Sequence, residues 1–272
     1  MRVGADGKQG AGPWSRRHAH ERIPALASAY LCTRRRPADA TIMEIGDVNV
    51  EFVPDGEVRG RPEALFPGSD WSAHTHLLDG DGNVIANVGS FLVRTPTEVV
   101  LVDVGLGGEL LTNLGALGVA PDDVDLVVLT HLHRDHVGWV GAFPRARYAV
   151  DRREWEYWCE HPGGVGPDPD RVLAHIEGRR ETLDHRRLTA ISTPGHTPGH
   201  TSVLVTGAET DQRLLILGDL LHTRAQYDNP DWAFRSDVDA ERARASRLEV
   251  FARFRDARTV FADGHFHGVA LG

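Results

Sequence analysis

Cysteine and long apolar runs are scarce in this sequence. Its 272 residues contain two cysteines, Cys32 and Cys159, which lie in unrelated contexts. Neither a disulfide framework nor a cysteine metal site can be built from them, and this usage favours a cytoplasmic location. No segment approaches the ~20 consecutive apolar residues that span a bilayer, so we expect no membrane partner.

Positive charge is also in short supply. The chain has 30 Lys and Arg against 39 Asp and Glu, a formal net charge of -9. Nucleic acids and anionic membranes are bound largely through neutralisation of phosphates by Lys and Arg, so we expect no nucleic-acid partner. With 41% hydrophobic and 25% charged residues, the chain has the composition of a globular protein. A small-molecule substrate is the better expectation.

The first forty residues differ from the rest of the chain. Arg16 and Arg17 precede an apolar run over 23–31, as in a twin-arginine export signal, but Glu21 and Pro24 break that pattern. We therefore expect residues 1–42 to be a flexible, Gly- and Arg-rich N-terminal extension. Residues 43–272 are expected to form a single folded domain.

Apolar periodicity predicts a β-rich opening third followed by alternating helices and strands. Alternating or continuous apolar residues predict strands over 45–52, 84–93, 98–102, 125–130, 147–150, 188–192, 202–206, 214–217 and 259–262. Helical spacing of apolar residues predicts helices over 110–117, 152–160, 170–178 and 239–254. A turn is expected at 54–56, where the sequence reads Pro-Asp-Gly. This order indicates mixed sheets covered by helices.

The segment 130–136, THLHRDH, is the densest group of potential metal ligands. It follows an apolar run and contains His131, His133, Asp135 and His136. In an extended or loop backbone the side chains of His131 and His133 point to the same side, so both rings can bind one ion. Asp135 and His136 can then turn toward a second ion.

Three further candidate ligands each follow a short apolar strand: His196, Asp219 and His265. A glycine stands directly before each of them, which permits the tight turns that bring such side chains together at strand ends. His267 is the alternative to His265 as the last ligand. His200 repeats the Pro-Gly-His pattern, but at the start of a predicted strand we expect it to have a buried hydrogen-bonding role.

Five motifs, in this order, resemble those of the metallo-β-lactamase superfamily over about residues 45–268: LVDVG with Asp103, HLHRDH, PGHTPGH, GD at 218–219 and GH at 264–265. The resemblance implies an α+β fold, an αββα sandwich of two mixed β-sheets flanked by helices. It implies two Zn²⁺ ions, with Mn, Co or Fe as other options. The first ion would be held by His131, His133 and His196, the second by Asp135, His136 and His265, with Asp219 bridging both.

Departures from the family pattern narrow the chemistry. His136 stands where many true β-lactamases have Arg, and Asp219 stands where those enzymes have Cys, which counts against β-lactam hydrolysis. His133 replaces the Glu of flavodiiron proteins, which favours zinc over a redox di-iron site. Because all seven ligands are present, the single-iron dioxygenase branch is also disfavoured.

The stretch GDLLHTRAQYDNPDW is similar to the methyl parathion hydrolase and quorum-quenching lactonase groups. This resemblance implies a dinuclear hydrolase in which metal-bound hydroxide cleaves an ester or lactone, N-acyl homoserine lactones included. Asp135, Asp219 and His222 are the expected catalytic residues, with Asp135 receiving a proton and His222 polarising the scissile group. A phosphotriesterase and a nuclease of the same fold are the alternatives, and a non-catalytic metal-stabilised binding protein is a further one.

The surroundings of the site can also be predicted. Asp103 is expected to orient a ligand histidine, with His200 as a second supporting residue. Aromatic loops suggest an apolar or acyl-bearing substrate, with these residues lining the pocket: Phe66, Trp71, His76, Trp139, Phe143, Tyr227, Trp232 and Phe234. Arg242, Arg244 and Arg247 are expected on a solvated helix face. A homodimer is one option for the assembly.

Overall fold

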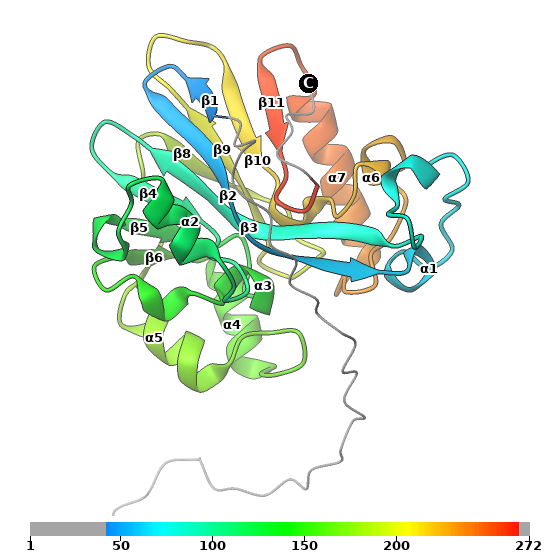
Figure 1. Ribbon diagram of the computed structural model, residues 1–272, viewed down its shortest axis with the longest axis horizontal. Helices are drawn as coiled ribbons and strands as arrows, with labels where there is room; N and C mark the ends of the chain where they lie inside the picture. The colour runs from blue at the N-terminus through cyan, green and yellow to red at the C-terminus, as the bar shows by residue number, and fades with distance from the viewer. Residues whose placement is uncertain (1–41, 267–272) are drawn as a thin grey trace, which may run out of the picture.

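The computed structural model describes residues 42–266, which form two β-sheets and their covering helices (Figure 1). The larger sheet has the strand order β1-β2-β3-β4-β5-β6-β7, and the smaller has the order β11-β10-β9-β8. The strands are β1 Ile42–Ile45, β2 Val48–Gly60, β3 Val84–Arg94, β4 Val99–Val102, β5 Leu126–Val128, β6 Arg147–Ala149, β7 Arg180–Glu181, β8 Leu188–Ser192, β9 Thr201–Thr206, β10 Arg213–Ile216 and β11 Thr259–Ala262. Both sheets combine parallel and antiparallel pairs.

Most of the helices are short. The α-helices are α1 Pro62–Leu65, α2 Leu110–Ala116, α3 Arg134–Val137, α4 Arg152–Glu160, α5 Ala174–Glu177, α6 Ala225–Asp228 and α7 Ala240–Phe254. Single turns of other helix types are η1 Thr75–Leu77, η2 Pro121–Asp123, η3 Val140–Ala142, η4 Pro169–Leu173 and η5 Gly218–Leu220. Among the described residues, no helix is both long and apolar enough to cross a membrane.

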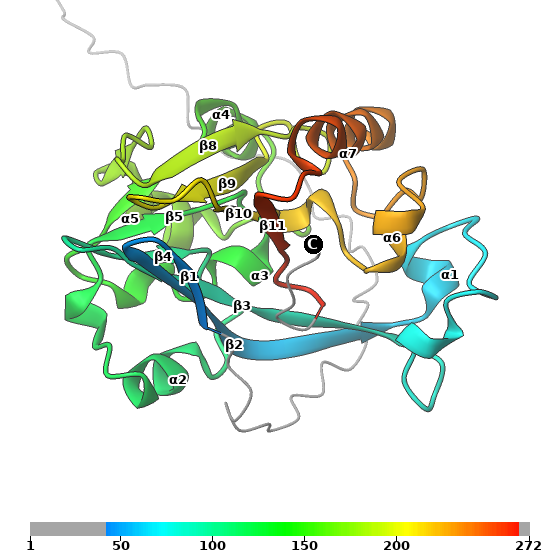
Figure 2. The ribbon, with the colours of Figure 1, turned by 90° about the horizontal axis from the view of Figure 1, so that it is seen from above.

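The layers are helix, sheet, sheet, helix. One apolar core lies between the large sheet and the helices α2 to α5, a second lies between the two sheets, and a third lies between the small sheet and α7. Figure 2 shows α7 outside the small sheet and α2 outside the large one. The predicted α+β sandwich of two mixed sheets flanked by helices is therefore confirmed.

Burial on both faces explains the continuous apolar runs of the central strands. In β4, Val100 and Val102 face the core between the sheets, while Leu101 faces the core under the helices. In β5, Leu126 faces the core between the sheets and Val127 faces the core under the helices. Successive side chains of a strand point to opposite faces, so a strand that is covered on both sides has no place for a polar residue.

The turn expected at 54–56 is wrong. The strand β2 continues through this segment and pairs with β3 on both sides of a bulge, in which Asp55 is the extra residue. The buried Asp55 carboxylate accepts hydrogen bonds from the backbone N–H groups of Leu106, Gly107, Gly108 and Leu110. The bulge therefore turns Asp55 toward the loop after β4, and this long-range bonding replaces the local turn.

The helices expected over 152–160 and 239–254 are confirmed as α4 and α7, whereas the segment expected as one helix over 170–178 divides into the π-turn η4 and the short α5. Asp239 caps α7 by accepting the N–H of Arg242. The expected N-terminal extension lies outside the described residues except for Ile42, which begins β1. His267 also lies outside them.

The solvated position expected for Arg247 on α7 is wrong. Its side chain is fully buried and donates to the backbone carbonyls of Pro230, Trp232 and Leu220 at 2.9, 3.0 and 3.5 Å. A guanidinium provides five N–H donors, enough to bind all three carbonyls. Arg247 thus attaches α7 to the end of η5 and to the loop that follows α6.

Candidate metal centre

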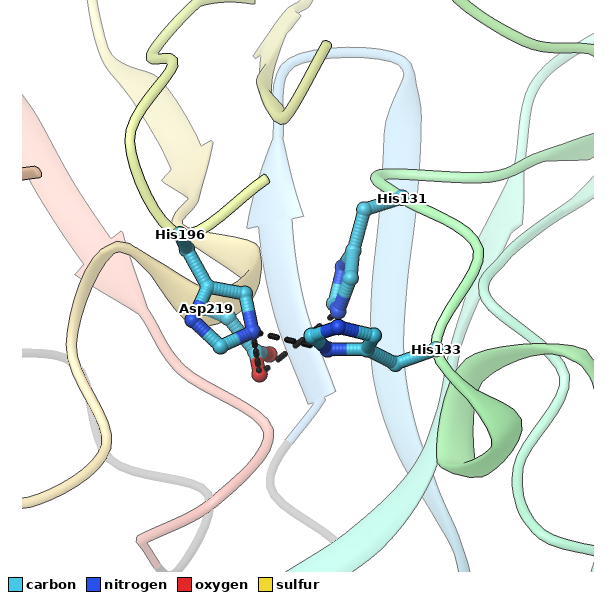
Figure 3. Close-up of side chains that lie close together, drawn as sticks. All are labelled: His131, His133, His196 and Asp219. Carbon is cyan, nitrogen blue, oxygen red and sulfur yellow. Dashed lines mark hydrogen bonds and ion pairs between the residues drawn. The ribbon is translucent and has the colours of Figure 1, made fainter. Parts of the chain in front are cut away.

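The seven predicted ligands come together at one edge of the sandwich. His131 and His133 follow β5, and Asp135 and His136 lie in α3, all on the large-sheet side. The small sheet contributes the others from three strand ends, His196 before β9, Asp219 after β10 and His265 after β11. Figure 3 shows His131 and His133 facing His196 and Asp219 across this edge.

One donor set is fully buried. Ligand atoms of His131, His133, His196 and Asp219 lie within 4.8 Å of one another. The Asp219 Oδ2 atom is 3.1 Å from His196 Nε2 and 3.7 Å from His131 Nε2. His133 Nδ1 lies 2.9 Å from His196 Nε2. We call the three histidines of this group the first set, because Asp219 also faces a second set.

A second donor set lies on the other side of the same carboxylate. Ligand atoms of Asp135, His136 and His265 also lie within 4.8 Å of one another. The Asp219 Oδ1 atom is 2.9 Å from His265 Nε2 and 3.0 Å from His136 Nε2. Each oxygen of Asp219 therefore faces a different group of donors, the arrangement that a shared carboxylate between two ions requires.

The donor set fits divalent metal ions. Among the described residues, the buried Nε2 atoms of His131 and His133 have no hydrogen-bond partner. A buried polar atom without a partner costs about 1–3 kcal/mol, a cost that a bond to a metal would remove. Imidazole nitrogens and carboxylate oxygens are typical ligands of zinc. The residues present therefore fit the zinc ions that the family resemblance implies.

Outer contacts orient the ligand rings. His136 Nδ1 lies 2.8 Å from Asp103 Oδ2, and His265 Nδ1 lies 2.8 Å from the carbonyl of Asn87. His196 Nδ1 lies 3.0 Å from Asp237 Oδ1. Such partners fix the tautomer and direction of a metal-binding imidazole. The structure places Asp103 where the sequence predicted a supporting carboxylate, whereas Asp237 was not among the predicted residues.

Asp219 organises the electrostatics of the cluster. Burial opposes protonation of His196 and His265, but Asp219, together with Asp237 beside His196 and Asp263 beside His265, outweighs it and raises their pKa to about 9 and about 10. Burial, together with neighbouring rings, lowers the pKa of His131 and His133 well below the ordinary value. The surroundings of Asp219 therefore attract positive charge, which either protons or metal ions can supply.

Two further histidines contact Asp219, His200 at its backbone and His222 at its carboxylate. His200 Nε2 accepts the backbone N–H of Asp219 at 2.9 Å, so its ring holds the backbone of this residue. His222 Nε2 is 3.2 Å from Asp219 Oδ2, and the ring stacks on Phe234 with centroids 3.6 Å apart. Burial lowers the pKa of His222 to about 4, so the imidazole is neutral at pH 7.

Part of the expected aromatic pocket forms as one group. Phe66, Trp71, Trp232 and Phe234 pack together, and Phe234 connects them to the His222 ring. Phe66 and Trp71 are 1% and 8% exposed, so they pack against one another and leave little surface for a ligand.

The other expected pocket residues lie elsewhere. Phe143 is buried in the core beneath the large sheet, and Trp139 packs against the same core while its indole N–H donates to Asp55. Tyr227 packs against Phe251 of α7. His76 is exposed. Phe143 therefore lies in a core directly after η3, and the partly buried Tyr227 lies against α7.

Space beside the second set is small. A cavity of about 20 Å³ is lined by Asp103, Asp135, His136, Asp219 and His265, among others. That volume holds roughly one water molecule. The side chain of Asp135 is 30% exposed, whereas those of Asp219 and His136 are 4% and 8% exposed. Solvent thus reaches the centre on the side of Asp135.

A family profile described as the metallo-beta-lactamase superfamily matches residues 86–265. This range holds the five motifs, and the fold has the layers that the family resemblance implies. The chain belongs to the metallo-β-lactamase superfamily.

Several relatives are bacterial lactonases. The chain is 40% identical over 102 residues to the N-acyl homoserine lactonase AttM of Azorhizobium caulinodans, which is 33% of this chain and 39% of that protein. It is 35% identical over 160 residues to AttM of Rhizobium radiobacter, 53% of this chain and 60% of that protein. The chain thus spans less than two thirds of these relatives.

A solved structure has the same fold. AidC, a dizinc quorum-quenching lactonase in complex with the product N-hexanoyl-L-homoserine, matches with a TM-score of 0.73 and 22% sequence identity. The match covers 84% of this chain and 92% of AidC.

Proposed function

We propose that this chain is a metal-dependent hydrolase that binds two divalent ions, zinc foremost, and opens the ester bond of a lactone. N-acyl homoserine lactones are the leading substrate class. The observation that carries the proposal is Asp219, whose two oxygens face two separate donor sets. The relatives named as N-acyl homoserine lactonases support the substrate class.

Each residue of the two sets has a role in this proposal. His131, His133 and His196 would hold one ion, Asp135, His136 and His265 the other, and Asp219 both. When bound, such ions supply Lewis acidity that polarises a carbonyl and lowers the pKa of a coordinated water from 15.7 toward about 7. The buried position of the histidines keeps competing water away from their nitrogens.

Two side chains are suited to move protons or orient the substrate. Asp135 is the ligand most open to solvent, so its carboxylate can take up the proton released during attack and pass it to water. His222 is neutral and buried beside Asp219, so its imidazole can donate a hydrogen bond to the scissile carbonyl or to the leaving alkoxide. Phe234, stacked on this ring, fixes its plane.

Hydrolysis of a small substrate panel by the zinc-loaded protein tests the proposal. The panel contains an N-acyl homoserine lactone, a γ-lactone without the amide, an aryl ester and a phosphotriester. We expect the highest kcat/KM on the acyl homoserine lactone. A preference for the phosphotriester would move the protein to the alternative substrate class. Bound zinc without turnover of any compound would indicate a metal-stabilised binding protein and contradict the proposal.

A further inference from the structure

Glu154 is a buried carboxylate on α4 that lies outside both donor sets. Its side chain is 0% exposed, on a helix whose first turn is capped by Asp151 through the N–H of Arg153. An ionised carboxylate in an apolar interior is costly unless several donors satisfy it. Glu154 meets this requirement, because four donors surround its carboxylate.

The two carboxylate oxygens serve different segments of the chain. Oε1 accepts the backbone N–H of Leu132 at 2.9 Å and the indole N–H of Trp158 at 2.7 Å. Oε2 accepts the hydroxyl of Thr197 at 2.6 Å and the backbone N–H of Gly199 at 3.0 Å. One oxygen thus holds the loop after β5, and the other holds the turn before β9.

Both segments carry ligands of the first set. Leu132 stands between His131 and His133, and Thr197 directly follows His196. The loop after β5 belongs to the large sheet and the turn before β9 to the small sheet, so a single side chain connects ligand segments of both sheets. The turn also passes directly against α4, because a Cβ on Gly199 would come within 2.1 Å of the Glu154 backbone nitrogen.

We propose that Glu154 is a positioning residue that fixes the distance between the His131–His133 segment and His196. The inference rests on the proposed metal-binding function, and it assigns to α4 a role in metal affinity. All four partners are N–H or O–H donors, and an ionised carboxylate is the group that only accepts. Glutamine cannot replace it, because in either orientation its NH₂ group would face a backbone N–H, that of Leu132 or that of Gly199.

The test is the zinc affinity of Glu154→Gln, measured by competition with a chromophoric chelator. We expect a loss of about 10–100-fold, the effect typical of partners that orient metal ligands, together with a changed visible spectrum of the Co²⁺-loaded protein. Glu156→Gln is the matched control, because Glu156 lies on the same helix with a side chain that is 52% exposed. This control should bind zinc like the wild type.

A second pair of variants separates positioning from stability and remains informative if Glu154→Gln does not fold. Thr197→Val removes one donor that belongs to a ligand segment, whereas Trp158→Phe removes one donor that does not and keeps an aromatic ring in the edge contact with His133. Both lose a hydrogen bond to the same carboxylate, so similar decreases in melting temperature are expected. We expect Thr197→Val to weaken zinc binding and Trp158→Phe to leave it unchanged.

The outcomes distinguish this inference from the proposed function. If the wild type binds zinc and Glu154→Gln or Thr197→Val binds it equally well, the positioning role is contradicted and the proposed function stands. Equal loss of affinity in Thr197→Val and Trp158→Phe also contradicts it, since that result indicates general destabilisation. If the wild type binds zinc but hydrolyses no lactone, the proposed function falls while the affinity comparison still decides the role of Glu154. A wild type that binds no zinc overturns both.

Discussion

The two donor sets of this site differ in their surroundings. His131, His133 and His196 of the first set are 0%, 4% and 2% exposed and come from both sheets. The second set contains Asp135, whose side chain is 30% exposed, beside His136 on the same short helix. Under the proposed function, we expect the buried set to bind its ion tightly and the open set to be the side on which a substrate approaches.

Both sets have supporting contacts, and in the second set these are Asp103 for His136 and the Asn87 carbonyl for His265. Glu154 and Asp237 hold segments or rings of the first set from the protein interior. The Asp135 carboxylate of the second set lies 3.8 Å from His136 Nε2, and its side chain is partly exposed to solvent. We infer that metal affinity depends mainly on the first set, and that proton transfer depends on the second.

The largest effect is expected for Asp219→Ala, which removes the group that both sets share. We expect kcat/KM on a lactone to fall by about 1000-fold, equivalent to about 4 kcal/mol, with fewer than two zinc ions per chain. The exposed Asp211→Ala is the control. A variant that retains both ions and full activity would show that Asp219 is not the shared ligand.

The next prediction separates the two sets directly, through His133→Ala and Asp135→Ala. We expect His133→Ala to lose zinc affinity, because its ring belongs to the buried set. Asp135→Ala should keep zinc at the first set but lower kcat by about 100-fold, a typical contribution of a general base. Zinc titration and steady-state kinetics on both variants measure this. Equal losses of affinity in the two variants would remove the distinction between the sets.

Asp237→Asn tests the support of His196. The amide keeps the shape of the carboxylate but removes the charge that faces His196 Nδ1 at 3.0 Å. We expect zinc affinity to fall by about 10-fold, at the lower end for an outer partner of a metal ligand. Asp231→Asn, with a side chain that is 68% exposed, is the matched control. Unchanged affinity in Asp237→Asn would mean that His196 is oriented by packing alone.

The smallest effect concerns the metal-free protein and pH. The pKa of His196 is raised to about 9 and that of His265 to about 10, so their contribution to stability is full below pH 6.5 and is lost as the pH rises through 9 to 10. Zinc requires the neutral rings, so zinc affinity should increase over the same range.

Thermal unfolding of the metal-free protein at pH 7 and pH 10 measures this effect. The melting temperature should decrease between the two, and His265→Gln should reduce the decrease. A melting temperature that is the same at both pH values would show that Asp219 does not hold these rings in the charged form.

The ligands could be predicted from the sequence because a local sequence pattern indicates each of them. Most of the strands that end at the site are short apolar runs, and the ligand follows within a few residues, often after a glycine such as Gly195 or Gly218. Strands buried on both faces give the clearest patterns. The sheets and the seven residues that meet at their edge could therefore be predicted without coordinates.

The supporting residues could not be found in this way, because their partners are distant in the sequence. Glu154 bonds to Leu132 and to Gly199, which lie 22 and 45 residues away. Asp237 meets His196, 41 residues away. No local pattern distinguishes these carboxylates from solvated ones. Their roles follow only from the packing of α4 and of the loop before α7.

The burial of Arg247, in contrast, could have been predicted from the sequence. The buried residues Ala243, Val250 and Phe254 share one face of α7, and Arg247 stands four residues after the first of them, on the same face. The interleaved charges of the helix favoured a solvated interpretation. Helical periodicity was the better guide, since position on the helix decides burial before residue type does.

The most direct test of the central claim is metal content combined with reversible chelation. Plasma mass spectrometry of the purified protein should give close to two zinc ions per chain. Hydrolysis of an N-acyl homoserine lactone should disappear after chelation and return when zinc is added back. Lactone hydrolysis that continues at an undiminished rate in the metal-free protein would contradict the account.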